Sequence, residues 1–159
     1  MPDMRDEMRR TFGDRGPAVG RQPQSNRTFV QFPAGYPAYL DANLCIRIEL
    51  VTTVAQRLAD GFKDEGKLTR HQLRAFYDHA KRQLQRLDYG TPFCEVHAEI
   101  ARLKAFASDR AGRANNPLPD SFKGFIDRNV DAVVDETSFK KGFMPHFEAV
   151  VAYCARLKD

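Results

Sequence analysis

Residues Lys67–Leu87, KLTRHQLRAFYDHAKRQLQRL, carry the clearest helical pattern in the chain. Their apolar side chains recur at steps of three and four residues, the spacing that lines one face of a helix. Thr69 suits the N-cap position, and Gln72 three residues later completes a capping box. The sequence therefore predicts a helix that starts at Thr69, stops near Gly90 and buries one face. That face comprises Leu73, Phe76, Tyr77, Ala80, Leu84 and Leu87.

The opposite face of this predicted helix is basic. It gathers Arg70, Arg74, Lys81 and Arg82, with Asp78 as the one acid among them. Such a face is either a solvated surface that keeps the protein soluble or a row of cations that neutralises the phosphates of a nucleic-acid backbone. The charge pattern by itself leaves both interpretations open.

The composition restricts the class of protein. A chain of 159 residues with 42% hydrophobic content and 12 Phe is large enough for one domain with a real core. The 25 basic and 21 acidic residues leave a net charge of +4, which favours an acidic partner only if it is concentrated on one face. A basic excess this small therefore does not by itself identify a partner.

The cysteines and the N-terminus indicate the cellular compartment in which the protein is expected. The three cysteines lie 49 and 60 residues apart, which fits neither zinc ligands nor a disulfide framework. The N-terminus lacks the apolar segment of a secretion signal, and no apolar run approaches the length of a membrane span. We therefore expect a cytoplasmic protein with reduced thiols and no membrane partner.

The first 40 residues differ from the rest of the chain. Glycine and proline punctuate them, they hold six arginines and four acids, and no periodicity is present beyond a brief alternation at residues 28–32. We expect a flexible, slightly basic arm over residues 1–40 and a helical bundle domain over residues 41–159. A plain disordered terminus is the alternative to an arm with a role of its own.

Four further segments have helical periodicity. One starts at Asp41, with Leu44 and Ile48 on its apolar face, and a very short turn predicts that it lies antiparallel to the helix from Thr69. The others cover about residues 92–110, 120–134 and 138–157, separated in part by a loop at 111–119. Pro145 predicts a break or kink at residues 142–145. With no convincing strand, the fold class is all-α, a compact bundle of about five helices.

Catalytic patterns are absent from the sequence. The four histidines, His71, His79, His97 and His146, form no metal-binding motif, and the acid pairs have spacings that solvated helix faces produce freely. We expect no enzyme activity, no cofactor and no metal site. A histidine phosphotransfer bundle, with His71 or His79 as the modified residue, is an alternative of similar size and fold class.

Three segments together resemble a known family. They are Leu68-Thr69 with Gln72-Leu73-Arg74, Phe76-Tyr77 and Lys81; Ala105-Phe106-Ala107 followed by Arg110; and Phe147-Glu148-Ala149-Val150-Val151-Ala152-Tyr153. In this order and spacing they resemble the small α-helical subunit of type III-A CRISPR effector complexes, the second member of the Csm set. The resemblance spans about residues 42–157.

The resemblance implies a non-catalytic subunit with several partners. Copies of such a protein stack beside one another along the backbone subunits of the complex and help to hold CRISPR RNA paired with target RNA. Sequence recognition would then be delegated to base pairing, and the protein would contact backbone and shape. The equivalent subunit of type III-B complexes is the nearest alternative, and an unrelated regulatory or protein-interaction bundle is a more distant one.

Candidate RNA-binding residues follow from the resemblance and from the helix geometry. Arg74 and Lys81 match the family motif, and Arg110 is next. Arg70, Arg82 and Arg113 are added from helix geometry and loop position alone. We expect Phe76 and Tyr77 to belong to the core rather than to stack on bases, because they share a stripe with apolar residues.

Overall fold

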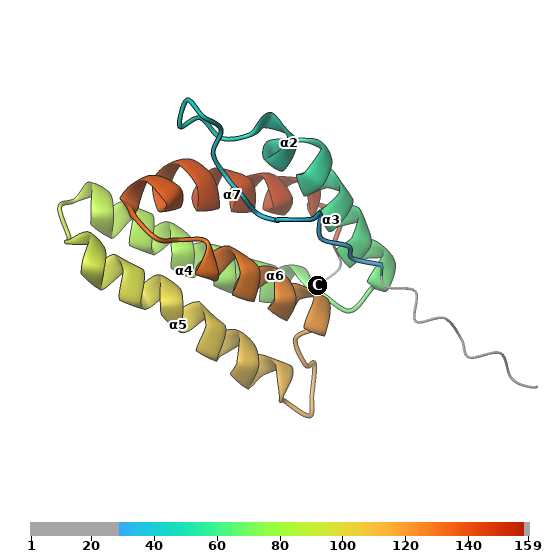
Figure 1. The fold of residues 1–159 in the computed structure, drawn as a ribbon. Coiled ribbons are helices and arrows are strands. Elements are labelled where there is room, and N and C mark those ends of the chain that lie inside the picture. Colours follow the sequence, from blue (N-terminus) through green and yellow to red (C-terminus); the bar gives the residue numbers. More distant parts are fainter. Residues whose placement is uncertain (1–28, 158–159) are drawn as a thin grey trace, which may run out of the picture.

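The computed structural model describes residues 29–157, and these form a helical bundle (Figure 1). The described part contains no strand, only an isolated antiparallel bridge between Leu40 and Ile46. The helices are α2 (Ile48–Val51), α3 (Thr53–Glu65), α4 (Arg70–Asp88), α5 (Phe93–Ala111), α6 (Asp120–Asp131) and α7 (Met144–Tyr153), with a π-helix, η1 (Ser138–Phe143), leading into α7. Helices α3 to α7 each have 10 or more residues, which confirms the predicted all-α bundle of about five helices.

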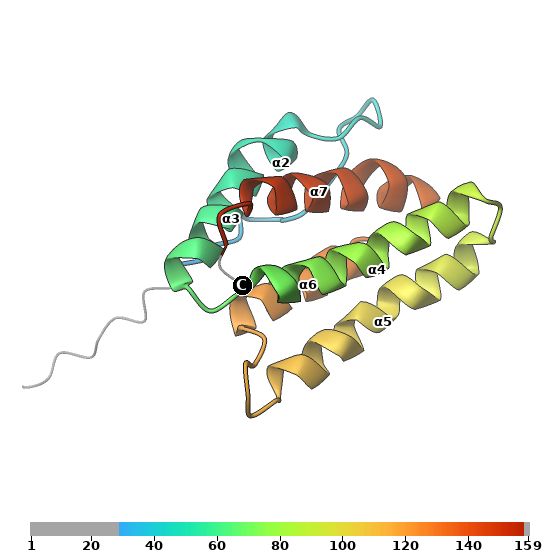
Figure 2. The ribbon, with the colours of Figure 1, turned by 180° about the vertical axis from the view of Figure 1, so that it is seen from behind.

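Helix α7 is central to the arrangement of the bundle (Figures 1 and 2). It packs against α2 and α3 on one side and against α4 on the other, while α5 packs against both α4 and α6. Phenylalanine rings join these layers: Phe122 of α6 lies edge-on to Phe62 of α3 and to Phe76 of α4, with centroid distances of 5.6 and 5.4 Å. The core therefore connects helices that are distant in the sequence.

Helix α4 begins as predicted. The Thr69 hydroxyl oxygen accepts a hydrogen bond from the Gln72 N–H at 3.1 Å, and the Gln72 side-chain oxygen accepts one from the Thr69 N–H at 3.0 Å. This capping box satisfies N–H groups that have no partner within the helix. The predicted apolar face packs inward, with Leu73, Phe76, Ala80 and Leu87 buried and Tyr77 and Leu84 half-buried.

The predicted helix from Asp41 starts later than expected. The Asp41 carboxylate accepts hydrogen bonds from the N–H groups of Asn43 and Cys45, at 2.8 and 3.0 Å, and so holds a turn instead of capping a helix. Short polar side chains compete with helices in this way. Leu44 and Ile48 were expected on the buried face, but they are 58% and 73% exposed. That assignment is wrong.

Helices α3 and α4 are not the predicted antiparallel neighbours. Helix α3 makes its main contacts with α7, and α4 makes its own with α5 and α7. The short connection at residues 66–69 fixes only where the two helices end and begin. Their apolar faces are both covered by α7, whose position the local sequence does not indicate.

The predicted break near Pro145 is a change of helix type. The chain is a π-helix up to Phe143 and continues directly into α7, whose first turn contains Pro145. Gly142 is needed in η1, because a Cβ there would come within 2.5 Å of the Tyr39 side chain. The predicted helical segment over residues 120–134 ends earlier, at Asp131, and Val134 lies between α6 and η1 and is 71% exposed.

Residues 29–40 lie against the helices, so packing begins before the predicted domain boundary at residue 41. Val30 and Tyr39 are buried. Gly61 of α3 permits the close approach of this segment, because a Cβ at Gly61 would lie 2.6 Å from the Phe29 carbonyl oxygen. The remainder of the predicted arm, residues 1–28, lies outside the described residues.

Tyr36, Tyr39, Asn129 and His146 form a cluster that we call the buried polar cluster. The His146 ring is fully buried; its Nδ1 donates to the Leu50 carbonyl, so its Nε2 accepts from the Tyr36 hydroxyl. The Asn129 amide donates to the Tyr36 hydroxyl at 2.9 Å, and its side-chain oxygen accepts from the Tyr39 hydroxyl at 2.7 Å. The cluster thereby fastens the N-terminal segment to α2, α6 and α7.

Burial keeps the groups of this cluster uncharged. Desolvation lowers the pKa of His146 to about 4, because the charged imidazolium would lose its water without gaining a counter-charge. Desolvation also raises the pKa of Tyr36 and of Tyr39 above the ordinary tyrosine value. In the part of the chain that the structure describes, every buried side-chain nitrogen and oxygen has a hydrogen-bond partner.

Candidate nucleic-acid interface

Helix α4 lies between α7 and α5 and carries most of the candidate residues (Figure 2). One side of the helix carries Arg74, Lys81 and Arg82, which are exposed, and Arg70, which is half-buried; we call it the basic side of α4. Contacts divide these residues between two flanks. Arg70 bonds to the turn after α7, and Lys81 lies over Tyr77, whose ring stacks on α7, whereas Arg82 faces a hollow shared with α5.

On the flank toward α7, two of the three cations are in contact with other groups. The Arg70 guanidinium donates to the Ala155 carbonyl at 3.0 Å and so holds the C-terminal turn. The Lys81 ammonium lies 5.7 Å from the centre of the Tyr77 ring, which stacks on Phe147 of α7. Arg74, between them, is exposed and has no ion-pair or hydrogen-bond partner within residues 29–157.

On the flank toward α5, Arg82 and Arg110 line one hollow with a volume of about 260 Å³. The Arg110 guanidinium lies 5.3 Å from the centre of the Phe76 ring, which is buried in the core as the sequence predicted. Asp78 contributes the one carboxylate that residues 29–157 place in this hollow. Arg82 is exposed and, like Arg74, has no ion-pair or hydrogen-bond partner in the described part of the chain.

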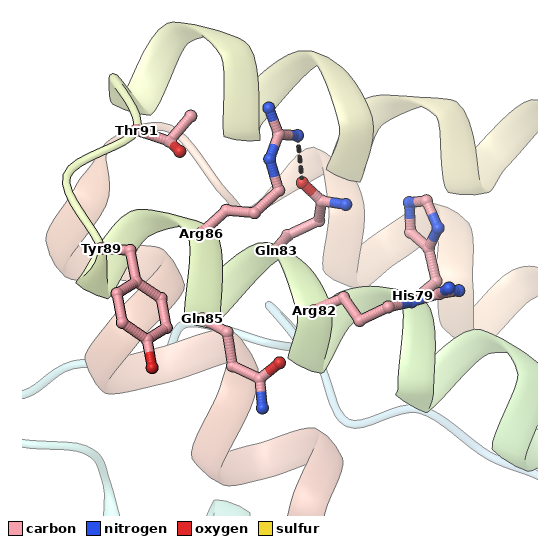
Figure 3. A pocket seen from close by; sticks show the side chains of 7 residues that line it. All are labelled: His79, Arg82, Gln83, Gln85, Arg86, Tyr89 and Thr91. Atoms are coloured by element: carbon pink, nitrogen blue, oxygen red, sulfur yellow. Dashed lines mark hydrogen bonds between the residues drawn. The ribbon is translucent and has the colours of Figure 1, made fainter.

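A second hollow, of about 530 Å³, continues from Arg82 to the end of α4 (Figure 3). We call it the terminal hollow. Among the described residues, none that lines it is acidic: they are His79, Arg82, Gln83, Gln85, Arg86, Tyr89 and Thr91. The Arg86 guanidinium donates to the Gln83 side-chain oxygen at 2.9 Å and lies 3.5 Å from the Glu95 carboxylate. Arg86 is thus oriented toward α5, while Arg82 remains open to solvent.

Arg113 stands apart from the other candidates. It lies in the loop after α5 and forms an ion pair with Asp109 at 2.9 Å, in which both side chains are exposed. The carboxylate offsets much of its charge locally. No contact in the described part of the chain therefore joins Arg113 to a residue of α4.

Sequence reasoning missed Arg86 and Tyr89. Arg86 could have been found from the step of four residues that separates it from Arg82, because this step places both on neighbouring turns of the helix. Tyr89 follows the last apolar residue of the stripe, so residue spacing alone could not show whether it is buried in the core or exposed. The structure leaves it 92% exposed at the end of α4.

The histidines form no site in the structure. His79 Nε2 is 3.1 Å from the Glu99 carbonyl oxygen, and its ring lies edge-on to Phe106. His71 is exposed on α4. Within residues 29–157, no group of three or more His, Cys, Asp and Glu side chains could hold a metal ion, and no helix is long and apolar enough to cross a membrane.

Comparison with known proteins identifies the family. A family model described as Csm2 Type III-A matches residues 46–158, which include every helix of the bundle. No curated protein and no solved structure matches the chain. The family match agrees with the resemblance found in the sequence and with its assignment to type III-A rather than type III-B. The chain therefore belongs to the Csm2 Type III-A family and is a small subunit of type III-A CRISPR complexes.

Proposed function

We propose that this subunit is non-catalytic, packs along the repeated backbone subunits of the complex in the cytoplasm, and contacts guide and target RNA through the basic side of α4. The observation that carries the proposal is the state of Arg74 and Arg82. Both are exposed, both lie on the same helix, and neither has an ion-pair or hydrogen-bond partner within the described residues. Their charge is therefore available to a partner.

The expected contact is with RNA phosphates rather than with base edges. Arg74 and Lys81 are seven residues apart on α4, a separation of about 10 Å along the helix axis. Long cationic side chains spaced along a straight, rigid element can follow a charged strand without reading its sequence. This suits a complex in which base pairing with the guide selects the target.

Several copies of the subunit would share the work of binding. If neighbouring copies line one RNA, the contacts of each copy become intramolecular once the first is made, and their affinities combine. Each copy then needs only a few phosphate contacts. A single free subunit is accordingly expected to bind RNA weakly.

The test compares complexes that contain either the wild-type subunit or the double variant Arg74→Gln/Lys81→Gln. We expect the variant to co-purify with the other subunits as the wild type does and to bind target RNA more weakly. Each lost phosphate contact should make the dependence of log affinity on log salt shallower by about 0.7 to 0.9. Binding measured at several salt concentrations gives this slope.

Arg57→Gln is the matched control. Arg57 is an exposed arginine on α3, has no ion-pair or hydrogen-bond partner in the described part, and lies on a helix that packs mainly on α7. An equal loss of RNA binding in this control would contradict a specific role for α4. So would unchanged RNA binding by the double variant in an intact complex. Failure of the double variant to assemble would identify the basic side of α4 as a protein contact instead.

A further inference from the structure

We propose that the terminal hollow receives one unpaired RNA nucleotide, whose base stacks on Tyr89 and whose phosphate lies against Arg82. This inference rests on the proposed RNA contact and adds to it a residue that contacts a base. The phosphate contacts on α4 do not require it, so the two proposals can fail separately.

Tyr89 offers an unusually open aromatic surface. Its side chain is 92% exposed, and in Figure 3 its ring extends from the end of α4 away from α5. Stacking of a flat surface on a tyrosine ring in water is favourable, and every nucleic-acid base supplies such a surface. The ring is therefore suited to stacking that tolerates any base.

The backbone around Tyr89 is fixed by hydrogen bonds. The Thr91 N–H donates to the Arg86 carbonyl at 3.0 Å, and the Gly90 N–H donates to the Leu87 carbonyl at 3.1 Å. This pair of bonds is a Schellman motif, which needs a left-handed residue after the helix; Gly90 provides it with a φ of 96°. Tyr89 is thus attached to a rigid turn, so little backbone entropy is lost when a base stacks on it.

Residues on the same side of α4 as Tyr89 supply the groups that a nucleotide needs. Arg82, Gln85 and Tyr89 follow one another at steps of three and four residues, so they share one side of α4. Arg82 is a cation without a protein partner among the described residues, and no carboxylate lines the hollow to repel a phosphate. The Gln85 amide, which Figure 3 shows on the same side as the Tyr89 ring, can both donate to and accept from the edge of a base.

The nucleotide must be unpaired. A base within a duplex is covered on both faces by its neighbours, so it has no free face for a tyrosine ring. A base at a strand end, in a gap or displaced from the duplex does have one. The terminal hollow therefore selects for a nucleotide outside the RNA duplex, whereas the basic side of α4 accepts the backbone of paired or unpaired RNA.

The test follows the tyrosine ring signals of the full chain by NMR during titration with short RNA. The probes are hexaadenylate and an abasic hexamer with the same number of phosphates. We expect upfield shifts of the Tyr89 ring protons with hexaadenylate alone, because only a stacked base produces a ring current. Tyr89→Phe assigns the signal by its disappearance, and Tyr153, which is partly exposed on α7, is the internal control.

Variants separate stacking from charge. Tyr89→Leu should weaken hexaadenylate binding roughly tenfold and leave binding of the abasic hexamer unchanged, whereas Tyr89→Phe should retain both. Arg82→Gln should weaken binding of both probes. Because both side chains are exposed, these variants are expected to fold as the wild type does.

Two results would overturn the inference. The first is a Tyr89 signal that hexaadenylate leaves unmoved, or that the abasic hexamer moves equally; if Arg82→Gln still weakens binding, the phosphate contact survives alone. The second is a Tyr89→Leu chain that binds hexaadenylate normally but no longer joins the complex. That outcome would assign Tyr89 to a contact with a neighbouring protein subunit.

Discussion

Within the buried polar cluster each hydroxyl, amide and imidazole group has a partner inside the protein, whereas on the basic side of α4 Arg74 and Arg82 have no such partner among residues 29–157. The cluster therefore contributes to stability, and its groups are unavailable to any ligand. The two arginines contribute a charge that the fold does not use. Comparing the two regions separates what holds this subunit together from what it can offer to a partner, and each region can be altered without the other.

The largest effect is expected from Asn129→Ala. The substitution removes three hydrogen bonds in a buried region: one that the side-chain oxygen accepts from the Tyr39 hydroxyl, and two that the amide donates to the Tyr36 hydroxyl and the Phe125 carbonyl. The Tyr39 hydroxyl keeps its bond to the Asn129 backbone carbonyl. At about 1 to 1.5 kcal/mol for each lost hydrogen bond, the free energy of unfolding should fall by roughly 4 kcal/mol. Urea denaturation followed by circular dichroism measures this change.

Asn43→Ala is the control for that experiment, because it makes the same substitution in an exposed loop. Its effect should stay within about 0.5 kcal/mol. If the two alanine variants unfold at the same urea concentration, the buried polar cluster does not stabilise the fold and the comparison fails.

A smaller effect is expected from acid. The folded chain holds the pKa of His146 at about 4, below the ordinary histidine value of 6.5, so the unfolded chain takes up a proton first as the pH falls. The contribution of neutral His146 is complete above pH 6.5 and is lost progressively between 6.5 and 4. At about 1.4 kcal/mol per pH unit, the loss approaches about 3 kcal/mol.

The measurement is the free energy of unfolding as a function of pH for the wild type and for His146→Leu. The variant starts lower, because it leaves the Tyr36 hydroxyl and the Leu50 carbonyl without their partner, but it lacks this titration. The difference between the two chains should therefore shrink as the pH falls from 6.5 to 4. Parallel pH profiles would show that His146 is not held neutral by the fold.

The smallest effect on stability is expected from substitutions on the basic side of α4. Arg74→Gln and Arg82→Gln should each change the free energy of unfolding by less than about 0.5 kcal/mol, because neither removes a contact within the described part. Arg70→Gln should cost about 1 kcal/mol, since it removes the bond to the Ala155 carbonyl. Thermal unfolding of the three variants distinguishes them. A large loss from Arg74→Gln would mean that its charge does serve the fold.

Local patterns in the sequence predicted α4 well. The capping box at Thr69 and the apolar stripe from Leu73 to Leu87 depend only on residues within one helix, and the structure has both. The prediction failed where a local side-chain hydrogen bond competes with the helical pattern. Leu44 and Ile48 fitted a helical period, but the Asp41 side chain favours a turn there.

The candidate site was predictable to a similar extent. Spacing placed Arg74, Lys81 and Arg82 on the exposed side of α4. It could not distinguish Arg74, which has no partner in the described part, from Arg70, whose partner is a carbonyl 85 residues away. The exposure of Tyr89 could not be predicted either, because it depends on which distant segments pack near the end of α4. Whether a side chain contacts residues that are distant in the sequence depends on the tertiary structure.

The hydrogen bond between Tyr36 and His146 also bears on how the chain is made. The ribosome releases Tyr36 long before His146, because 110 residues separate them. At the usual rates of synthesis this interval is roughly 5 to 20 seconds. During it, the N-terminal segment has no imidazole to bind, and α3 and α4 both lack α7, which covers them in the finished fold. A nascent chain that stops before α7 therefore cannot reach the native state.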